Sequence, residues 1–162
     1  MHAATDAFIR LVQHPFKFRF FLFSKLPSAF FSGVRVQAIS TGACTVTVPY
    51  KWFSQNPFRS TYFACQAMAA ELSTGALVMA HTYHSSPSVS ILVTGLEATF
   101  LKKATGITSF VCADGLLIRD AIAAAVQSSQ SGSVTATSTG RNQQGDVVAE
   151  FKVTWSFKAR SA

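Results

Sequence analysis

The sequence predicts an α+β protein in which a curved antiparallel sheet of about six strands wraps one long α-helix. Residues Ser60–Ala80 form a mostly apolar stretch without proline, and its alanines, leucines and methionines favour a helix. On both sides of this stretch, apolar and polar residues alternate, which is typical of strands with one buried face. A helix that is apolar on nearly every side needs cover all round, and a curved sheet provides it.

The first 32 residues are predicted to form a helical N-terminal extension. A helix at Thr5–Gln13 stops before His14, because the residue that precedes a proline avoids helical backbone angles. Aromatic segments at Phe16–Phe23 and Pro27–Phe31 continue the extension. A chain of 162 residues fits one domain, so we expect a single domain over residues 1–162 with its core at residues 33–158.

Alternating residues predict the strands. Val34–Ala38 and Cys44–Tyr50 surround a short glycine turn and indicate a hairpin. After the long helix, the alternation reverses its phase at Gly95, which is typical of a β-bulge. The remaining expected elements are Val89–Phe100, Ile107–Cys112, a second, shorter helix at Leu116–Val126, Ser133–Thr139 and Val147–Lys158. This order predicts three hairpins, with the long helix after the first and the shorter helix after the second.

Composition and charge narrow the function classes. Hydrophobic residues make up 49% of the chain and charged residues 13%, which is too apolar for a disordered protein. The net charge of +7 and the pI of about 9.7 favour anionic partners. The basic residues are scattered, however, and no aromatic residues interleave with them as in RNA-binding sheets, so no nucleic-acid partner is expected.

The cysteines and histidines indicate no metal site and no disulfide. The three cysteines, Cys44, Cys65 and Cys112, lie far apart in apolar surroundings and read as reduced, buried thiols of a cytoplasmic protein. The histidines form no ligand motif. No secretory signal is expected either, because the apolar run within Phe16–Phe23 is too short.

Two segments raise the question of a membrane. Ser60–Ala80 is long enough to span a bilayer, but Glu71 would then lie near the midplane, where a carboxylate is costly, so no stable membrane insertion is expected. The basic-aromatic segment Phe16–Phe23 could lie on a membrane surface. Packing of this segment over the protein core is the favoured interpretation.

Glu71 is the only charged residue in Ser60–Ala80. An ionised carboxylate in an apolar helix is costly unless it is paired, hydrogen-bonded or protonated. Glu71 therefore has either a structural partner or a chemical role. Thr74 shares its helix face and could assist it, although a hydroxyl bonded back to the helix is the simpler interpretation.

The segment Asn56-Pro57-Phe58-Arg59-Ser60-Thr61-Tyr62-Phe63, followed by Glu71, resembles the PaaI-like thioesterases of the hotdog fold. In that family an asparagine precedes the helix, a His-Gly-Gly-like segment opens it, and an acidic residue follows about two turns later. Asn56 matches the asparagine and Glu71 the acid. The chain is still more similar to an uncharacterised bacterial hotdog group, at Pro27–Val36 and Phe151–Lys158. From the residues alone, Asn56 reads equally well as a helix cap.

The resemblance implies a hotdog fold and a cytosolic acyl-CoA thioesterase that acts as a homodimer or a dimer of dimers, with active sites at the subunit interface. It implies Glu71 and Asn56 as catalytic residues and coenzyme A as part of the substrate, with no other cofactor. The expected substrate-binding residues are Tyr62, Phe63, Thr74, Arg59, Lys102 and Lys103. Tyr62-Phe63-Ala64 stands where the family has His-Gly-Gly, and this departure favours the alternative of a non-catalytic acyl- or CoA-binding protein.

Overall fold

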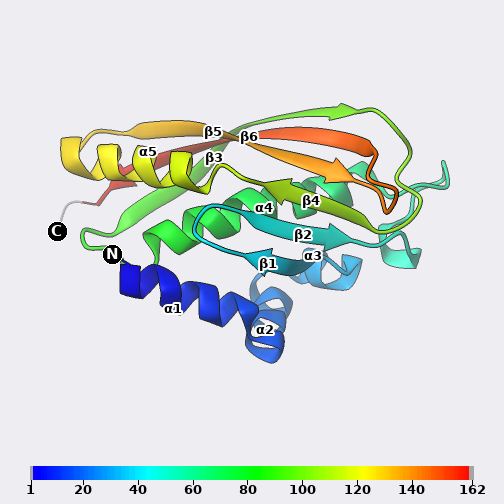
Figure 1. Cartoon of the computed structure of the whole chain (residues 1–162), viewed down its shortest axis with the longest axis horizontal. Coiled ribbons are helices and arrows are strands. Elements are labelled where there is room, and N and C mark those ends of the chain that lie inside the picture. Colours follow the sequence, from blue (N-terminus) through cyan, green and yellow to red (C-terminus); the bar gives the residue numbers. More distant parts are fainter. Residues whose placement is uncertain (1, 161–162) are drawn as a thin grey trace.

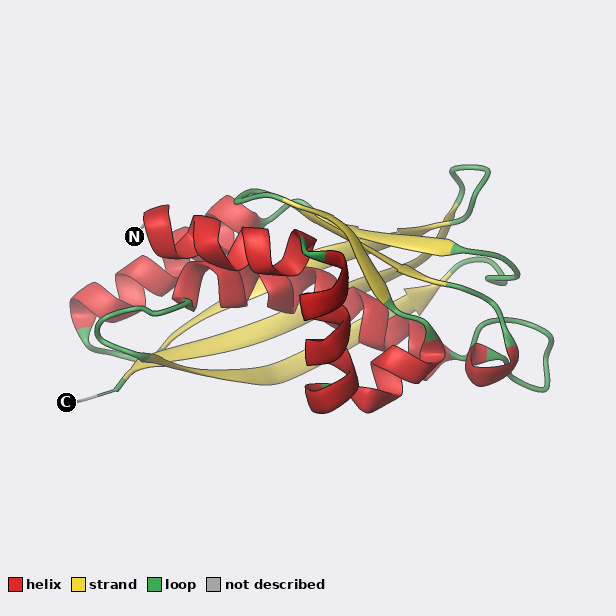
Figure 2. Ribbon diagram, turned by 90° about the horizontal axis from the view of Figure 1, so that it is seen from below, coloured by secondary structure: helices red, strands yellow, loops and turns green. Residues whose placement is uncertain are grey.

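The structure is a computed structural model that describes residues 2–160. The outer limits of the predicted domain, residues 1 and 162, lie outside this part of the chain. Figures 1 and 2 show a curved sheet with the long helix α4 lying against one face of it and further helices on the same side. The predicted α+β class, with a curved antiparallel sheet, a central helix and N-terminal helices, is confirmed.

Six strands form one antiparallel sheet in the spatial order β1-β2-β4-β5-β6-β3. The strands are β1 (Arg35–Ile39), β2 (Cys44–Val48), β3 (Val89–Phe100), β4 (Thr108–Cys112), β5 (Gly132–Arg141) and β6 (Val147–Ala159). The first and last predicted hairpins are present as β1-β2 and β5-β6. The sheet register shifts between Val93 and Gly95, which confirms the predicted bulge in β3.

The predicted middle hairpin is wrong. Strand β3 pairs with β6 along its whole length and forms one edge of the sheet, whereas β4 lies between β2 and β5. The loop between β3 and β4 is hydrogen-bonded to two segments that belong to neither strand. The carbonyl of Ala104 accepts from the N–H of Thr61, and the carbonyl of Gly106 accepts from the N–H of Tyr50. A turn tied to two other segments does not return the chain alongside β3.

The long helix α4 (Phe63–Thr82) begins three residues later than the sequence predicts. Thr61, which the prediction places inside the helix, pairs instead with Gln55 in an isolated β-bridge, and its hydroxyl donates to Ala104 O at 3.1 Å. Helix α4 is long and apolar enough to span a membrane by length and composition, but 67% of that stretch is buried within the protein. Its apolar character is therefore explained by the sheet and helices that surround it.

Two hydroxyl contacts join α4 to the sheet through an otherwise apolar core. Ser73 Oγ lies 2.7 Å from Ser138 Oγ of β5, and both side chains are fully buried. At the next residue of α4, Trp155 Nε1 of β6 donates to Thr74 Oγ1 at 3.0 Å. Around these contacts lie apolar side chains from the inner face of the sheet, among them Val46, Phe110, Phe151, Val153 and Phe157.

The other helices cover what the sheet leaves open. Helices α1 (His2–Gln13), α2 (Pro15–Lys25) and α3 (Pro27–Ser32) confirm the expected N-terminal helices and pack beside α4 and β1. Figure 2 shows α2 running across the direction of α1 and α4. Helix α5 (Gly115–Ser128) packs against α4 and β5, as its buried Ile118 and Ile122 indicate.

Candidate active site

A cleft of about 790 Å³ opens at the start of α4. The loop before the helix forms one wall, and the end of β3 with the segment that follows it forms the other. Five of the predicted site residues line this cleft: Asn56, Tyr62, Phe63, Lys102 and Lys103. Arg59, Glu71 and Thr74 do not.

The first turn of α4 presents two unused N–H groups at this cleft. The N–H groups of Cys65 and Gln66 both donate to the carbonyl of Tyr62. In the described chain, those of Phe63 and Ala64 have no hydrogen-bond acceptor, and no side chain caps the helix. Free N–H groups at a helix N-terminus carry partial positive charge and favour an anion or a polarised carbonyl oxygen.

Asn56 does not cap α4, which begins seven residues later. Its Oδ1 accepts from the N–H of Phe58 at 3.0 Å and from the N–H and the hydroxyl of Ser60 at 3.3 Å. These bonds close a tight turn in which Arg59 has a left-handed backbone, with φ of 58°. Asn56 thus holds the wall of the cleft through its oxygen, while its amide NH2 has no acceptor within residues 2–160. The Arg59 side chain is exposed outside the cleft lining.

Gln66 is a site residue that the sequence analysis missed. Its side chain is only 5% exposed and lines the cleft, and its Nε2 donates to Thr61 O at 3.0 Å. Its Oε1 is buried and accepts no hydrogen bond from any described residue. A buried acceptor without a donor is costly, so this oxygen points to a ligand that supplies an N–H or O–H. The only sequence signal was a glutamine among apolar residues in the first turn of the helix.

The two lysines at the cleft are exposed and differently held. Lys102 Nζ lies 3.1 Å from Asp146 Oδ2, and this hydrogen bond lowers the pKa of Asp146 below its usual value. Lys103 Nζ donates to the carbonyl of Phe58 at 3.1 Å, across the mouth of the cleft. Both positive charges therefore lie on the rim, where they add to the field of the helix N-terminus.

Glu71 lies two turns along α4 and is partly buried. Burial raises the pKa of its carboxyl group above the usual value. The carboxylate forms no hydrogen bond and no ion pair with any residue in the range 2–160, so the structure shows no structural partner for it there. It lines a separate cavity of about 240 Å³, between α4 and the junction of α2 with α3.

Thr74 is fully buried beneath Glu71, and its hydroxyl group is used twice. It donates to the carbonyl of Glu71 at 2.9 Å and accepts from Trp155 Nε1. The hydrogen bond from the Thr74 hydroxyl to the Glu71 carbonyl is thus a bond back to its own helix, as the simpler interpretation of Thr74 expects. No group of three or more possible metal ligands occurs among the described residues.

Comparisons with known proteins agree with this architecture. A probable thioesterase of unknown function from Pseudomonas aeruginosa superposes with a TM-score of 0.75 and 21% identity, covering 90% of this chain and 97% of that one. PaaI, from the phenylacetic acid degradation operon of E. coli, gives a TM-score of 0.62 and 13% identity over 88% of this chain and 91% of its own. A thioesterase from Haemophilus influenzae gives 0.62 and 10%, over 88% and 89%.

Among curated proteins, none matches the chain in sequence. Residues 18–157, most of the chain, match the family described as a domain of unknown function, DUF4442. The chain therefore belongs to the DUF4442 family and has the hotdog fold of these thioesterases.

Proposed function

We propose that the protein is a thioesterase that hydrolyses acyl-CoA or a related thioester. The observation that carries this proposal is the state of the Glu71 carboxyl group. Burial raises its pKa, and no described residue forms an ion pair with it. The names of the structurally similar proteins support a thioesterase at the level of the fold family. A structural acid would instead be paired, because an unpaired carboxylate in this position opposes folding.

In the proposed reaction, the N–H groups of Phe63 and Ala64 polarise the thioester carbonyl and stabilise the oxyanion that develops on its oxygen. Glu71 takes a proton from a water molecule while the water oxygen attacks the carbonyl carbon. The carbon–sulfur bond then breaks, the acid product leaves, and the proton passes from Glu71 to the departing thiolate. Direct attack by the Glu71 carboxylate is the other route that the same geometry supports. The free amide NH2 of Asn56 would hold the water or the carbonyl.

The proposal includes a homodimer, because the cleft and the Glu71 carboxylate line different cavities of one protomer. Strand β3 supports this part: it is a long edge strand whose second edge is unpaired within the described chain. Its inner face, which includes Leu96 and Phe100, is about half exposed and apolar. A second copy that adds its own β3 would cover this face. Glu71 of one protomer would then complete the cleft of the other.

Coenzyme A fits the polar features of the cleft. The orphan Oε1 of Gln66 would accept an amide N–H from the pantetheine arm, and the rim charges of Lys102 and Lys103 would meet phosphate groups. Arg59, exposed beside the same mouth, would extend this positive rim. A cytoplasmic location is also part of the proposal. Cys44 and Cys112 face each other across β2 and β4 as free thiols, and burial raises their pKa values to about 12 and about 11.

The test is release of free thiol from short-, medium- and long-chain and aryl CoA thioesters. Glu71→Gln is expected to lower kcat by about 10²–10⁴-fold, the usual contribution of general acid–base catalysis. Glu150→Gln, which changes an exposed glutamate on β6, is the matched control and should keep full activity. Unchanged turnover in Glu71→Gln, or no turnover of any thioester by the wild type, would count against a hydrolase.

The dimer is tested separately by analytical ultracentrifugation. Leu96→Asp places a charge on the inner face of β3. It should shift the protein towards monomer and abolish thiol release at the same time. Ala124→Asp, at an exposed position on α5 away from β3, serves as the control for added charge. A fully active monomer would contradict the shared site.

The second candidate function is binding of acyl groups or CoA without turnover. The observation that favours it is the pair of exposed rings at the start of α4. The ring centres of Tyr62 and Phe63 lie 4.9 Å apart, in the segment that matches the His-Gly-Gly of PaaI-like enzymes. A binder would gain melting temperature with fatty acyl-CoA while the thioester stays intact. Thiol release at a rate that depends on Glu71 would exclude it.

A further inference from the structure

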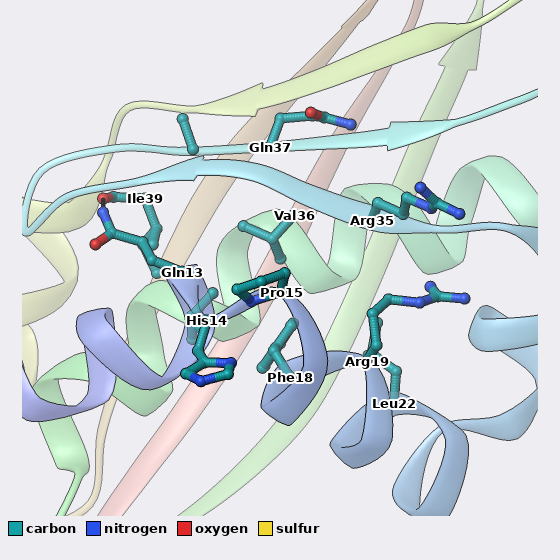
Figure 3. Close-up of a pocket in the computed structure, with 12 residues that line it drawn as sticks. Gln13, His14, Pro15, Phe18, Arg19, Leu22, Arg35, Val36, Gln37 and Ile39 are labelled. Atoms are coloured by element: carbon teal, nitrogen blue, oxygen red, sulfur yellow. Dashed lines mark hydrogen bonds between the residues drawn. The ribbon is translucent and has the colours of Figure 1, made fainter.

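A further cavity lies apart from the cleft and from the cavity beside Glu71, since it shares no lining residue with either. It has a volume of about 300 Å³ and lies where α1 and α2 meet the edge strand β1 (Figure 3). Two arginines contribute to it, Arg19 from α2 and Arg35 from the first position of β1.

Arg19 is held rigidly in this cavity. Its Nη1 donates to the carbonyl of Val34 at 3.1 Å, and its guanidinium lies 4.0 Å from the centre of the Phe30 ring. These two contacts fix the plane of the guanidinium and use one of its five N–H groups. The remaining N–H groups have no acceptor among residues 2–160.

Arg35 follows Val34 directly, so the carbonyl that binds Arg19 is next to the backbone of the second arginine. Figure 3 shows the two side chains extending in the same direction, one above the other, from α2 and β1. Burial, together with the charge of Arg35, lowers the pKa of Arg19 from its usual value. The two like charges therefore lie close enough to repel each other.

No carboxylate offsets this repulsion. The chain has only seven acidic residues, all of them within the described range, and none lines the cavity. Other polar groups in the lining already have partners: Gln13 Nε2 donates to Ile39 O, Gln37 Nε2 donates to Thr47 Oγ1, and His14 Nδ1 accepts from the first N–H groups of α2. The cavity thus presents two guanidinium groups with free N–H groups and no acidic partner in its lining.

We propose that Arg19 and Arg35 form a binding site for a phosphate group. Phosphate has the charge to balance two guanidinium groups, and its oxygens accept their paired N–H bonds in bidentate fashion. Two sources carry this group: the headgroup of an anionic phospholipid and a soluble phosphate compound. Phe16 and Phe20, which are 79% and 70% exposed on the same helix as Arg19, would lie beside lipid chains in the first case.

Binding is measured at one fixed ionic strength, because salt screens exposed charges. The lipid probe is co-sedimentation with vesicles of phosphatidylglycerol, with phosphatidylcholine vesicles as the neutral reference. The soluble probes are inorganic phosphate and adenosine 3′,5′-bisphosphate, read by the shift in melting temperature. The variants are Arg35→Gln, at an exposed position that leaves the Arg19 contacts intact, and Arg19→Lys, which keeps the charge but removes the planar fork. Arg10→Gln, an exposed arginine on α1 outside the lining, is the control.

Each arginine variant is expected to weaken binding roughly tenfold for whichever probe the site takes, while the control binds as the wild type does. Loss confined to phosphatidylglycerol vesicles assigns a lipid headgroup, and Phe16→Ser with Phe20→Ser should then also weaken it. Loss confined to the soluble probes assigns a free phosphate compound. Equal loss in Arg10→Gln, or undiminished binding in both site variants, would overturn the proposal, as would a wild type that binds none of the probes. The thioester assay on Arg35→Gln separates the two sites, since thiol release should be unchanged.

Discussion

Replacing Gly75 by alanine tests whether the Glu71 carboxylate must occupy its observed position. A Cβ atom at Gly75 would lie 3.1 Å from Glu71 Oε1, and 3.2 and 3.3 Å from two ring carbons of Trp155. Favourable carbon contacts are about 3.5–4.0 Å, so these neighbours must move by roughly 0.3 Å. The Trp155 ring is tied to Thr74 by a hydrogen bond, whereas Glu71 is free to turn. The carboxylate is therefore expected to give way first.

The expected effect on stability is small. Alanine is favoured over glycine inside a helix by about 1 kcal/mol, while overpacking a core costs about 1–3 kcal/mol. The free energy of unfolding of Gly75→Ala should thus lie between that of the wild type and about 2 kcal/mol below it. The effect on catalysis is larger, because a misplacement of about 1 Å can cost roughly 10²-fold. A shift of a few tenths of an ångström should lower kcat/KM on the order of tenfold.

Urea unfolding and thiol release from the best CoA thioester measure the two effects on the same preparation. Gly42→Ala is the matched control, because a Cβ there meets nothing within 4 Å. If folded Gly75→Ala turns over thioesters as fast as the wild type, the carboxylate beside Gly75 is not in its working position. A loss of stability well beyond 2 kcal/mol would instead show that the Trp155 ring, not the carboxylate, takes up the strain.

Three further predictions follow from buried groups. Glu71→Gln should raise the melting temperature near pH 8, because a carboxyl group whose pKa is raised by burial destabilises the folded state once it ionises. This gain in melting temperature should fade at about pH 4, which lies below the pKa of a glutamate in the unfolded chain (about 4.3). An equal gain at both pH values would contradict the reasoning. Trp155→Phe removes the N–H that binds Thr74 Oγ1 and should lower the free energy of unfolding in urea by about 1–3 kcal/mol. Gly140→Ala would bring a Cβ within 2.5 Å of the fully buried Phe110 ring, so it should cost about 3 kcal/mol in the same assay.

The controls for the last two predictions are exposed positions of the same residue type. Trp52 is 75% exposed, so Trp52→Phe should change the free energy of unfolding by less than about 0.5 kcal/mol. Gly42→Ala again matches Gly140→Ala. A loss of the same size at both members of either pair would show that the cost does not arise from the buried contacts.

Most elements of the fold could be predicted because the face that a residue occupies depends on its neighbours along the chain. Alternation located β6, and the phase reversal at Gly95 located the bulge in β3. Which strands pair is not contained in alternation, and this is why the hairpin of β3 with β4 was predicted wrongly. The hydrogen bonds from Thr61 and Tyr50 that hold the loop between these strands come from residues more than 40 positions away.

Prediction of the candidate site depended on the same distinction. Asn56, Tyr62 and Phe63 lie close together in sequence, so their convergence at the start of α4 could be expected. Gln66 was missed because an amide side chain in a helix is usually solvated, and only the fold shows that its oxygen is buried without a donor. The position of Arg19 beside Arg35 depends on how α2 lies against β1, which the aromatic composition of α2 does not specify.

The two hydroxyl contacts between α4 and the sheet have a consequence for how the helix is oriented. A helix that is evenly apolar has no preferred rotation about its axis within the surrounding sheet, since every rotation buries a similar area. The pairs Ser73–Ser138 and Trp155–Thr74 remove that freedom, because rotating or sliding the helix by one residue would strand these polar atoms in hydrocarbon. The two contacts therefore determine the rotation of α4 and, with it, the direction in which Glu71 points.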